Sequence, residues 1–233
     1  LSLARLEAEY RWDFEQAEIE FRRALQQQPD FLPAYLEYAI FLVFRGREEE
    51  ALTQLDQAVA IDPLAPAPGA IRGWVLLMLG RVGEARVELE EALALDPRLV
   101  ITHLNLGLLA LREERPAGAV EAFSRALEFA GPSPDIEGLL AYAEARSGRA
   151  SEARMRLAEL MQRSEAEYVP PISMAMIHLG LGEQQDAIRQ LRAGYGDRNW
   201  HLIMLREHFL FDSLRGSEGF ESLVAAVELG GQR

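Results

Sequence analysis

The chain repeats itself every 34 residues, and this period restricts its fold more than any other feature. The segment FEQAEIEFRRA at 14–24 returns as EEEALTQLDQA at 48–58 and VGEARVELEEA at 82–92, and weaker copies follow. Each copy has an anchor alanine with a large apolar residue four positions later. A fixed period of this size is typical of proteins that stack one small structural unit. The six anchors are Ala17, Ala51, Ala85, Ala119, Ala153 and Ala187.

The spacing within each unit predicts two antiparallel helices. A small residue stands twelve positions before five of the six anchors, which allows two helices to approach closely. Glycine stands five positions before four anchors, where a turn needs positive φ, and Trp12 and Glu114 replace it in two units. Proline cannot continue a helix interior, so it ends the second helix of the first three units. Those prolines are Pro29, Pro63 and Pro97.

This pattern of small residue, glycine, alanine, large apolar residue and proline resembles the tetratricopeptide repeat (TPR). The resemblance implies an all-α, right-handed superhelical solenoid, because one hairpin cannot bury its apolar stripe alone. We expect about six hairpins over residues 1–194 and capping helices over 195–233. The outer helix of unit one is expected to be frayed or trimmed, and units five and six to be tilted or offset.

The tail after residue 194 lacks the repeat. We expect a short helix near Trp200–Arg206, then a turn, and a last helix with Ser217 as its N-cap, ending at Gly230. The simplest interpretation is a cap over unit six, with an apolar stripe of Leu223, Val224 and Val227.

The same tail carries a second resemblance. The segment REHFLFDSLRGSEGF at 206–220 is similar to the end of TPR arrays in bacterial regulators that also carry a winged-helix, cyclase or Ser/Thr kinase domain. Because the sequence begins with Leu1, we interpret it as a piece of a longer polypeptide.

Composition excludes several functional classes. The formal net charge is −13, which disfavours direct binding to nucleic acid or anionic lipid. No apolar run is long enough for a membrane span. Cysteine is absent, so disulfides and thiolate chemistry are excluded. We expect a cytoplasmic location, with the periplasm as an alternative.

We expect no catalysis, no cofactor and no metal. The sequence has no convergent set of catalytic residues and, without lysine, no phosphate-binding loop of the Gly-Lys type. His201 and His208 are seven residues apart, which does not match a two-histidine zinc site. His103 and His178 are expected to pack or to form hydrogen bonds within the array.

The resemblance also implies a partner-binding groove, because the first helix of each TPR unit lines the concave face. The positions that face inward are mainly apolar in units two to four. TPR domains that clamp a peptide carboxylate need lysine, arginine and asparagine there, and we reject that class for this chain. The implied groove residues are Leu36, Ile40, Phe44, Trp74, Leu77, Met78, Leu104, Leu108, Leu111, Arg112, Tyr142 and Arg146.

Monomers rarely expose a large apolar patch, so we expect something to cover this groove. The first hypothesis is a scaffold that binds a peptide, a helix or a neighbouring domain of its own polypeptide. One alternative is the C-terminal sensory arm of a larger bacterial transcription regulator, cyclase or kinase. Another is self-association as a homodimer. The sequence leaves open whether the groove is exposed or covered by the chain itself.

Overall fold

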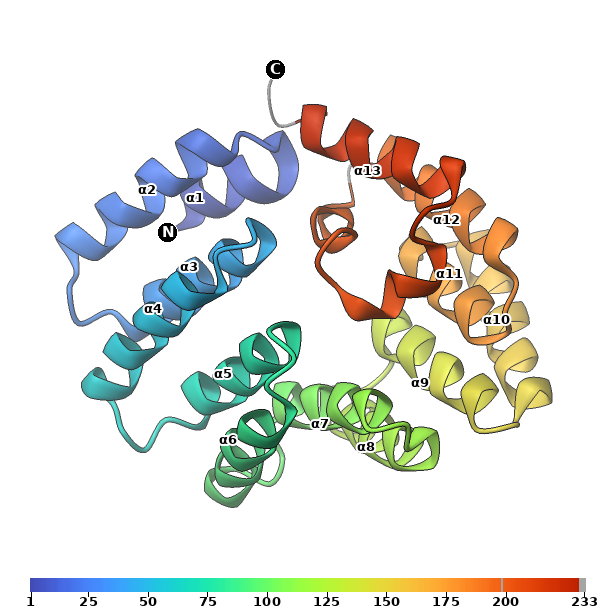
Figure 1. The fold of residues 1–233 in the computed structure, drawn as a ribbon, viewed down its shortest axis with the longest axis horizontal. Helices are drawn as coiled ribbons and strands as arrows, with labels where there is room; N and C mark the ends of the chain where they lie inside the picture. Colours follow the sequence, from blue (N-terminus) through green and yellow to red (C-terminus); the bar gives the residue numbers. More distant parts are fainter. Residues whose placement is uncertain (198, 231–233) are drawn as a thin grey trace.

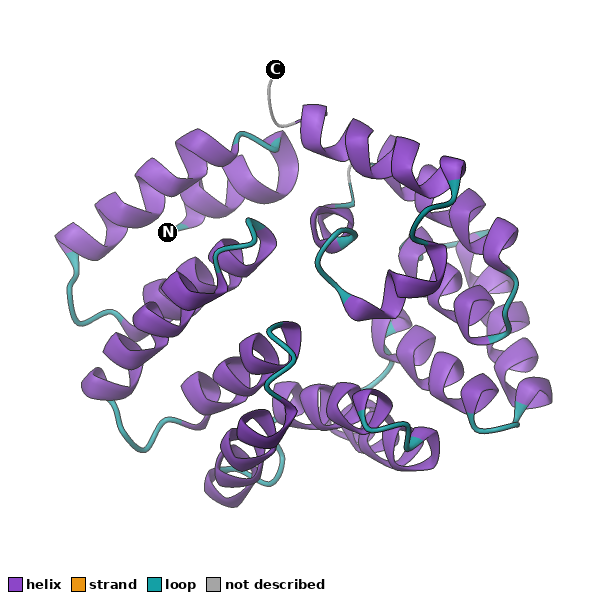
Figure 2. Cartoon of the chain, viewed as in Figure 1, coloured by secondary structure: helices purple, strands orange, loops and turns teal. Residues whose placement is uncertain are grey.

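A computed structural model describes residues 1–197 and 199–230. Helices and the turns between them account for this part of the chain, and no strand occurs in it (Figure 2). The expected all-α solenoid is thus confirmed. The helices are α1 (Ser2–Arg5), the π-helix η1 (Leu6–Arg11), α2 (Phe14–Gln27), α3 (Leu32–Phe44), α4 (Glu48–Ile61), α5 (Pro66–Met78), α6 (Val82–Leu95), α7 (Val100–Arg112), α8 (Pro116–Ala130), α9 (Pro134–Arg146), α10 (Ala150–Ser164), α11 (Pro171–Gly180), α12 (Gln184–Gly196), the 3-10 helices η2 (Trp200–Met204) and η3 (Phe209–Leu214), and α13 (Glu218–Gly230).

The helices form hairpins that follow one another along an arc, and α3, α5, α7, α9 and α11 line its inner side (Figure 1). The six anchor alanines lie in α2, α4, α6, α8, α10 and α12, and each is 0% exposed. The period of 34 residues therefore marks where paired helices pack. The division of the chain at residue 194 stays a prediction.

Small residues do allow the close packing that the repeat indicates. A Cβ atom added to Gly107 in α7 would lie 2.3 Å from a ring carbon of Phe123 in α8. A Cβ atom on Gly73 would lie 2.6 Å from Cγ of Leu89 in the same way. In both hairpins the large side chain four residues after the anchor occupies the space that glycine leaves, so neither position has room for a methyl group.

The turn inside each hairpin keeps one backbone conformation whatever residue occupies it. Gly46 and Gly80 have φ of 66° and 73°. Trp12 and Glu114, which replace glycine in two units, have φ of 57° and 55°. A side chain at such a φ is strained by roughly 1–2 kcal/mol. The geometry of the hairpin therefore overrides the local preference of these two residues.

Both ends of the array differ from its middle. The expected fraying at the start is wrong, because residues 2–11 are helical, as α1 and η1.

Near the other end, α9 and α11 come into backbone contact: a Cβ atom on Gly138 would lie 2.6 Å from the Ser173 carbonyl oxygen. One on Gly180 would lie 2.8 Å from Cα of Tyr142. Glycines thus permit a tighter approach of these two inner helices.

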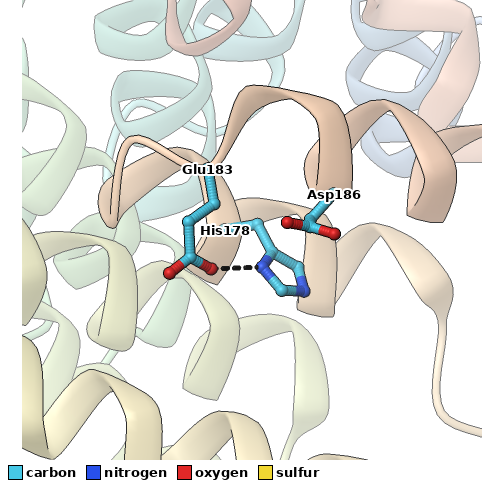
Figure 3. Close-up of side chains that lie close together, drawn as sticks. All are labelled: His178, Glu183 and Asp186. Carbon is cyan, nitrogen blue, oxygen red and sulfur yellow. Dashed lines mark hydrogen bonds and ion pairs between the residues drawn. The ribbon is translucent and has the colours of Figure 1, made fainter.

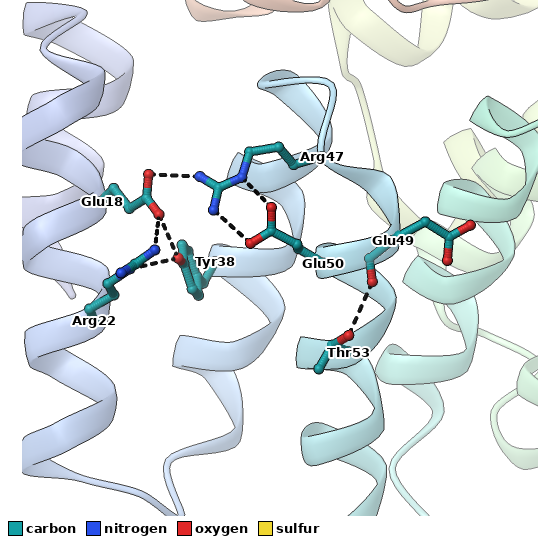
Figure 4. A network of polar contacts seen from close by, with 7 residues as sticks. All are labelled: Glu18, Arg22, Tyr38, Arg47, Glu49, Glu50 and Thr53. Carbon is teal, nitrogen blue, oxygen red and sulfur yellow. Dashed lines mark hydrogen bonds and ion pairs between the residues drawn. The ribbon is translucent and has the colours of Figure 1, made fainter.

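A polar network ties the first two hairpins together (Figure 4). The Glu18 carboxylate in α2 accepts hydrogen bonds from the Tyr38 hydroxyl (3.0 Å), from Arg22 (2.6 Å) and from Arg47 (2.7 Å). Arg47 also donates to Glu50 at the start of α4. Burial alone would raise the pKa of Glu18, but the hydrogen bonds from Arg47 and Tyr38 outweigh it, so that pKa lies below its usual value.

The tail departs from expectation in one respect. Helix α13 packs on α12 as a cap, and its stripe of Leu223, Val224 and Val227 is buried as expected. The Ser217 hydroxyl donates to the Leu214 carbonyl, while the N–H of Gly216 donates to the Glu221 carboxylate. The expected helix near residue 200 is the short 3-10 helix η2. The second 3-10 helix, η3, was not predicted.

Candidate functional site

The segment between α12 and α13 turns into the arc instead of staying on its outer face (Figure 1). We call residues 202–214 the groove segment. Five of its large apolar side chains are buried within the main hydrophobic core. The buried side chains are Leu202, Leu205, Leu210, Phe211 and Leu214, all at most 4% exposed.

The groove segment contacts the concave face at two places. The guanidinium of Arg112 at the end of α7 lies over the Phe209 ring, 4.3 Å from its centroid. Close to the α3–α4 turn, a Cβ atom on Gly46 would lie 3.7 Å from a carboxylate oxygen of Glu207. A cation held on an aromatic face is stabilised by roughly 0.5–2 kcal/mol. The groove is therefore occupied by the chain's own tail.

A cavity of about 250 Å³ remains between the groove segment and the inner helices. All five inner helices contribute to its wall, and the groove segment supplies the remaining side. The wall is mostly apolar and has four polar side chains. It is lined by Ile40, Phe44, Ile71, Trp74, Ile101, Leu104, Asn105, Leu108, Asp135, Leu139, Ile172, Ser173, Met176, Met204, His208, Leu210 and Phe211.

Five of the twelve expected groove residues lie in the wall of this cavity. Ile40, Phe44, Trp74, Leu104 and Leu108 line the cavity.

The remaining expected residues lie beside the cavity or beneath it. Leu36, Met78 and Leu111 are half-buried against the core, without lining the cavity. Leu77 is 0% exposed, so its expected place on the groove surface is wrong: its side chain is inside the core, where no partner can reach it.

Tyr142 and Arg146 lie where the groove segment passes α9. Burial raises the pKa of the Tyr142 hydroxyl, Arg146 lowers it, and Asp212 of the groove segment raises it. Asp212 is thus close enough to act electrostatically on this edge of the groove.

The largest pKa shift in the site is that of His208. Burial lowers its pKa to about 3, and the positive charge of Arg112 acts in the same direction. The ring is therefore neutral at physiological pH. Its Nδ1 accepts a hydrogen bond from the Leu210 N–H at 3.3 Å, so Nε2 carries the proton. The ring stacks on Phe209, with centroids 5.0 Å apart.

The arrangement of the groove segment could not be found from the repeat. The signal in the sequence is the density of large apolar residues in LIMLREHFLF at 202–211. A cap on one hairpin needs only one apolar stripe, which α13 supplies. A second apolar segment in the tail thus indicates a second surface to cover.

The two ends of the arc also meet. The ring of Trp12, in the turn of the first hairpin, lies 5.7 Å from the ring of Tyr195 near the end of α12. Ile203 of the groove segment lines a second cavity of about 230 Å³, beside Phe14 and Phe41 of the first two hairpins. The described chain thus forms a nearly closed ring around the groove segment.

One cluster has the residue types of a metal site (Figure 3). His178, Glu183 and Asp186 offer ligand atoms within 4.8 Å of one another at the α11–α12 turn. Glu183 already accepts hydrogen bonds from His178 (2.8 Å) and Arg154 (3.2 Å), and Asp186 pairs with Arg189. These hydrogen bonds and ion pairs stabilise the α11–α12 turn, which explains why the three residues lie together.

The other histidines agree with a structural role where they are described. The ring Nε2 of His103 lies 2.8 Å from the Pro97 carbonyl oxygen. The side chain of His201 lies outside the described residues. Asn105 donates its amide N–H to the Ala70 carbonyl at 2.8 Å, so that donor is used inside the protein. In the described part of the chain, no helix is long and apolar enough to cross a membrane.

Solved structures share the fold. A tetratricopeptide repeat protein from Parabacteroides merdae superposes with a TM-score of 0.64 at 14% identity, covering 97% of this chain and 82% of that one. PilW, a type IV pilus biogenesis factor, gives 0.61 at 21% identity, covering 91% and 95%. Cut9 with Hcn1, an APC/C hetero-tetramer, gives 0.62 at 17% identity, covering 92% and 39%.

At these identities the likeness establishes the fold alone. A comparison with curated protein sequences finds no match. Two sequence profiles of the tetratricopeptide repeat match residues 12–74 and 72–135. Together they span more than half of the chain, and the anchor alanines within them are buried between paired helices. The chain therefore belongs to the tetratricopeptide repeat family.

Proposed function

We propose that this protein is an interaction scaffold whose concave groove binds a short apolar segment of a protein partner. Members of the family are generally non-catalytic scaffolds that bind proteins or peptides. We accordingly expect no reaction and no cofactor of its own. The observation that carries the proposal is the groove segment itself, whose Leu210 and Phe211 line one cavity together with all five inner helices.

The groove segment indicates which chemistry the groove accepts. It is short, it contains 3-10 turns instead of a long helix, and it places leucine and phenylalanine against the inner helices. A partner segment of similar composition could make the same contacts. It would compete with a tethered segment whose effective concentration is high, so binding requires either high affinity or a weakened tail.

The test compares co-purification by the intact chain and by charge variants. Trp74→Glu places a charge in the groove wall, where Trp74 contacts Phe44 edge-on with centroids 5.9 Å apart. Val87→Glu on α6 is the matched control, because Val87 is 55% exposed and away from the cavity. Circular dichroism verifies that both variants fold. We expect a partner protein to co-purify with the wild type and with Val87→Glu, but not with Trp74→Glu.

A synthetic peptide with the sequence of residues 202–214 supplies a defined ligand. Phe209→Ala removes the contact with Arg112 and should loosen the groove segment. We expect the labelled peptide to bind Phe209→Ala more tightly than the wild type, and adding Trp74→Glu to abolish binding. Binding of peptide or partner that persists with Trp74→Glu in a folded protein would place the interaction elsewhere and overturn the proposal.

The sensory arm of a larger bacterial regulator and the homodimer stay predictions from the sequence. No contact among the described residues favours either of them. The expected location in the cytoplasm stays a prediction as well.

A further inference from the structure

We propose that the cavity between the inner helices and the groove segment is a binding site for a small, neutral, mostly apolar molecule that carries one hydrogen-bond acceptor. The groove segment forms one wall of this cavity and the inner helices form the others, so the site is complete only while the segment is seated. A small molecule would therefore bind beneath the segment and not in competition with it.

The size of the cavity sets the size of the ligand. At about 250 Å³ it has more room than the roughly 150 Å³ of an engineered apolar cavity that binds benzene. Its wall is lined chiefly by isoleucine, leucine, methionine and aromatic side chains, which give water few partners. A molecule somewhat larger than benzene would replace missing packing contacts, and this provides the affinity.

One polar group of the wall has a free donor. His208 is 5% exposed, and its Nδ1 is used by the Leu210 N–H. The proton on Nε2 has no hydrogen-bond partner within the described part of the chain. A carbonyl or ether oxygen on the ligand would accept a hydrogen bond from this N–H. The structure thus combines a mostly apolar wall with a free N–H donor on His208.

A carboxylate in the cavity wall disfavours an anionic ligand. Asp135 lines the wall, where its carboxylate accepts a hydrogen bond from the Ser173 hydroxyl at 2.7 Å. The formal net charge of the whole chain is −13, so its field also repels anions. A fatty acid or another carboxylate would meet this repulsion in a site of low dielectric. A ketone, amide or lactone with an apolar body fits both the wall and the donor.

Prodan, a neutral aminonaphthalene ketone, is a suitable probe because its emission shifts to the blue in apolar surroundings. It is titrated into the intact chain, and dimethylaminonaphthalene, which lacks the ketone, is the comparison compound. We expect saturable binding of one prodan per chain with a blue shift, and binding of the comparison compound at least five-fold weaker.

The variant Leu104→Trp fills the cavity from α7. Leu106→Trp is its matched control, since Leu106 lies on the same helix and lines a different, outward-facing hollow. We expect Leu104→Trp to weaken prodan binding at least ten-fold and Leu106→Trp to leave it within two-fold. Wild-type protein that shows no saturable binding, or Leu104→Trp that binds as well as Leu106→Trp, would overturn the proposal.

His208→Phe tests the donor separately from the packing. It keeps an aromatic ring of similar size and removes Nε2–H. We expect it to bind prodan and the comparison compound with equal affinity, because the preference for the ketone depends on that donor. A preference that survives in His208→Phe would show that the donor is not involved and would contradict that part of the proposal.

Discussion

Glu114 shows at the scale of one residue how strongly the repeat imposes its geometry. It stands where four other units have glycine, and it adopts φ of 55°. Its side chain is exposed, and no hydrogen bond or ion pair of the described residues uses its carboxylate. Trp12 occupies the equivalent turn but is 2% exposed, so its side chain contributes packing that offsets its strain.

Replacing Glu114 should therefore increase stability. We expect Glu114→Gly to raise the free energy of unfolding by about 1 kcal/mol, because glycine accepts this φ without strain. Gly80→Ala makes the opposite change, at a glycine with φ of 73° where nothing lies within 4 Å of an added Cβ. It should lower the free energy of unfolding by about 1 kcal/mol. Chemical denaturation measures both changes. Equal stability of all three proteins would refute the strain argument.

Glycines in the inner helices act at the scale of an element, since they set how closely two helices approach. An added methyl group on Gly107 would overlap the Phe123 ring. Phe123 is fully buried and cannot move without displacing its neighbours. Alanine would gain about 1 kcal/mol in helix propensity, but overpacking costs typically about 1–3 kcal/mol.

We therefore expect Gly107→Ala to lower the free energy of unfolding by about 1–2 kcal/mol, as the net of these two effects. Gly83→Ala in α6 is the control, because nothing lies within 4 Å of its added Cβ and only the gain in propensity remains. Thermal or chemical unfolding compares the two variants. If Gly107→Ala stabilises the protein as Gly83→Ala does, the helices are not packed as closely as described.

The elements also show what the sequence could and could not predict. The hairpins were predictable because alanine stands at the same offset in all six copies, glycine in four and proline in three, so the clear copies identify the weaker ones. The groove segment has no such copies. Its role depends on residues far away in sequence, such as Arg112 and Trp74, and only the closed shape of the array brings them together.

The groove segment should loosen in acid. The pKa of His208 is lowered from 6.5 to about 3 in the seated state, so a released segment binds the proton more tightly. The seated state is therefore fully favoured above pH 6.5 and loses stability as the pH falls from 6.5 towards 3. At pH 5 the loss is about 2 kcal/mol relative to neutral pH. Arg112 opposes protonation, whereas Asp135 in the same wall would favour it.

Hydrogen exchange of the amides in residues 202–214 measures this loosening, after correction for the intrinsic pH dependence of exchange. We expect protection to fall between pH 7 and pH 5 in the wild type and to stay nearly constant in His208→Phe. The amides of α6 serve as an internal reference that should not change. A groove segment that stays equally protected at both pH values would show that His208 does not control its seating.

The whole molecule is a nearly closed ring with its own tail in the centre. The Trp12 and Tyr195 rings are in contact where its two ends meet. The groove segment lies on the concave face, where the sequence predicts a partner-binding groove. This arrangement explains how a chain with an apolar groove avoids a large exposed apolar patch. It also makes any partner of the groove a competitor of the tail.

Cross-linking tests the seated tail most directly, since the chain has no cysteine of its own. Gly46→Cys with Glu207→Cys places one thiol on each side of the close approach between the α3–α4 turn and the groove segment and keeps the contact of Phe209 with Arg112. Met155→Cys with Glu207→Cys is the control pair, because Met155 is 61% exposed on α10 and lies outside the cavity. We expect a short thiol-reactive cross-linker to join the first pair within one chain, as seen by mass spectrometry, and to leave the control pair unjoined. If the reagent instead attaches to each thiol separately in both pairs and joins neither, the groove does not hold the tail and the account is contradicted.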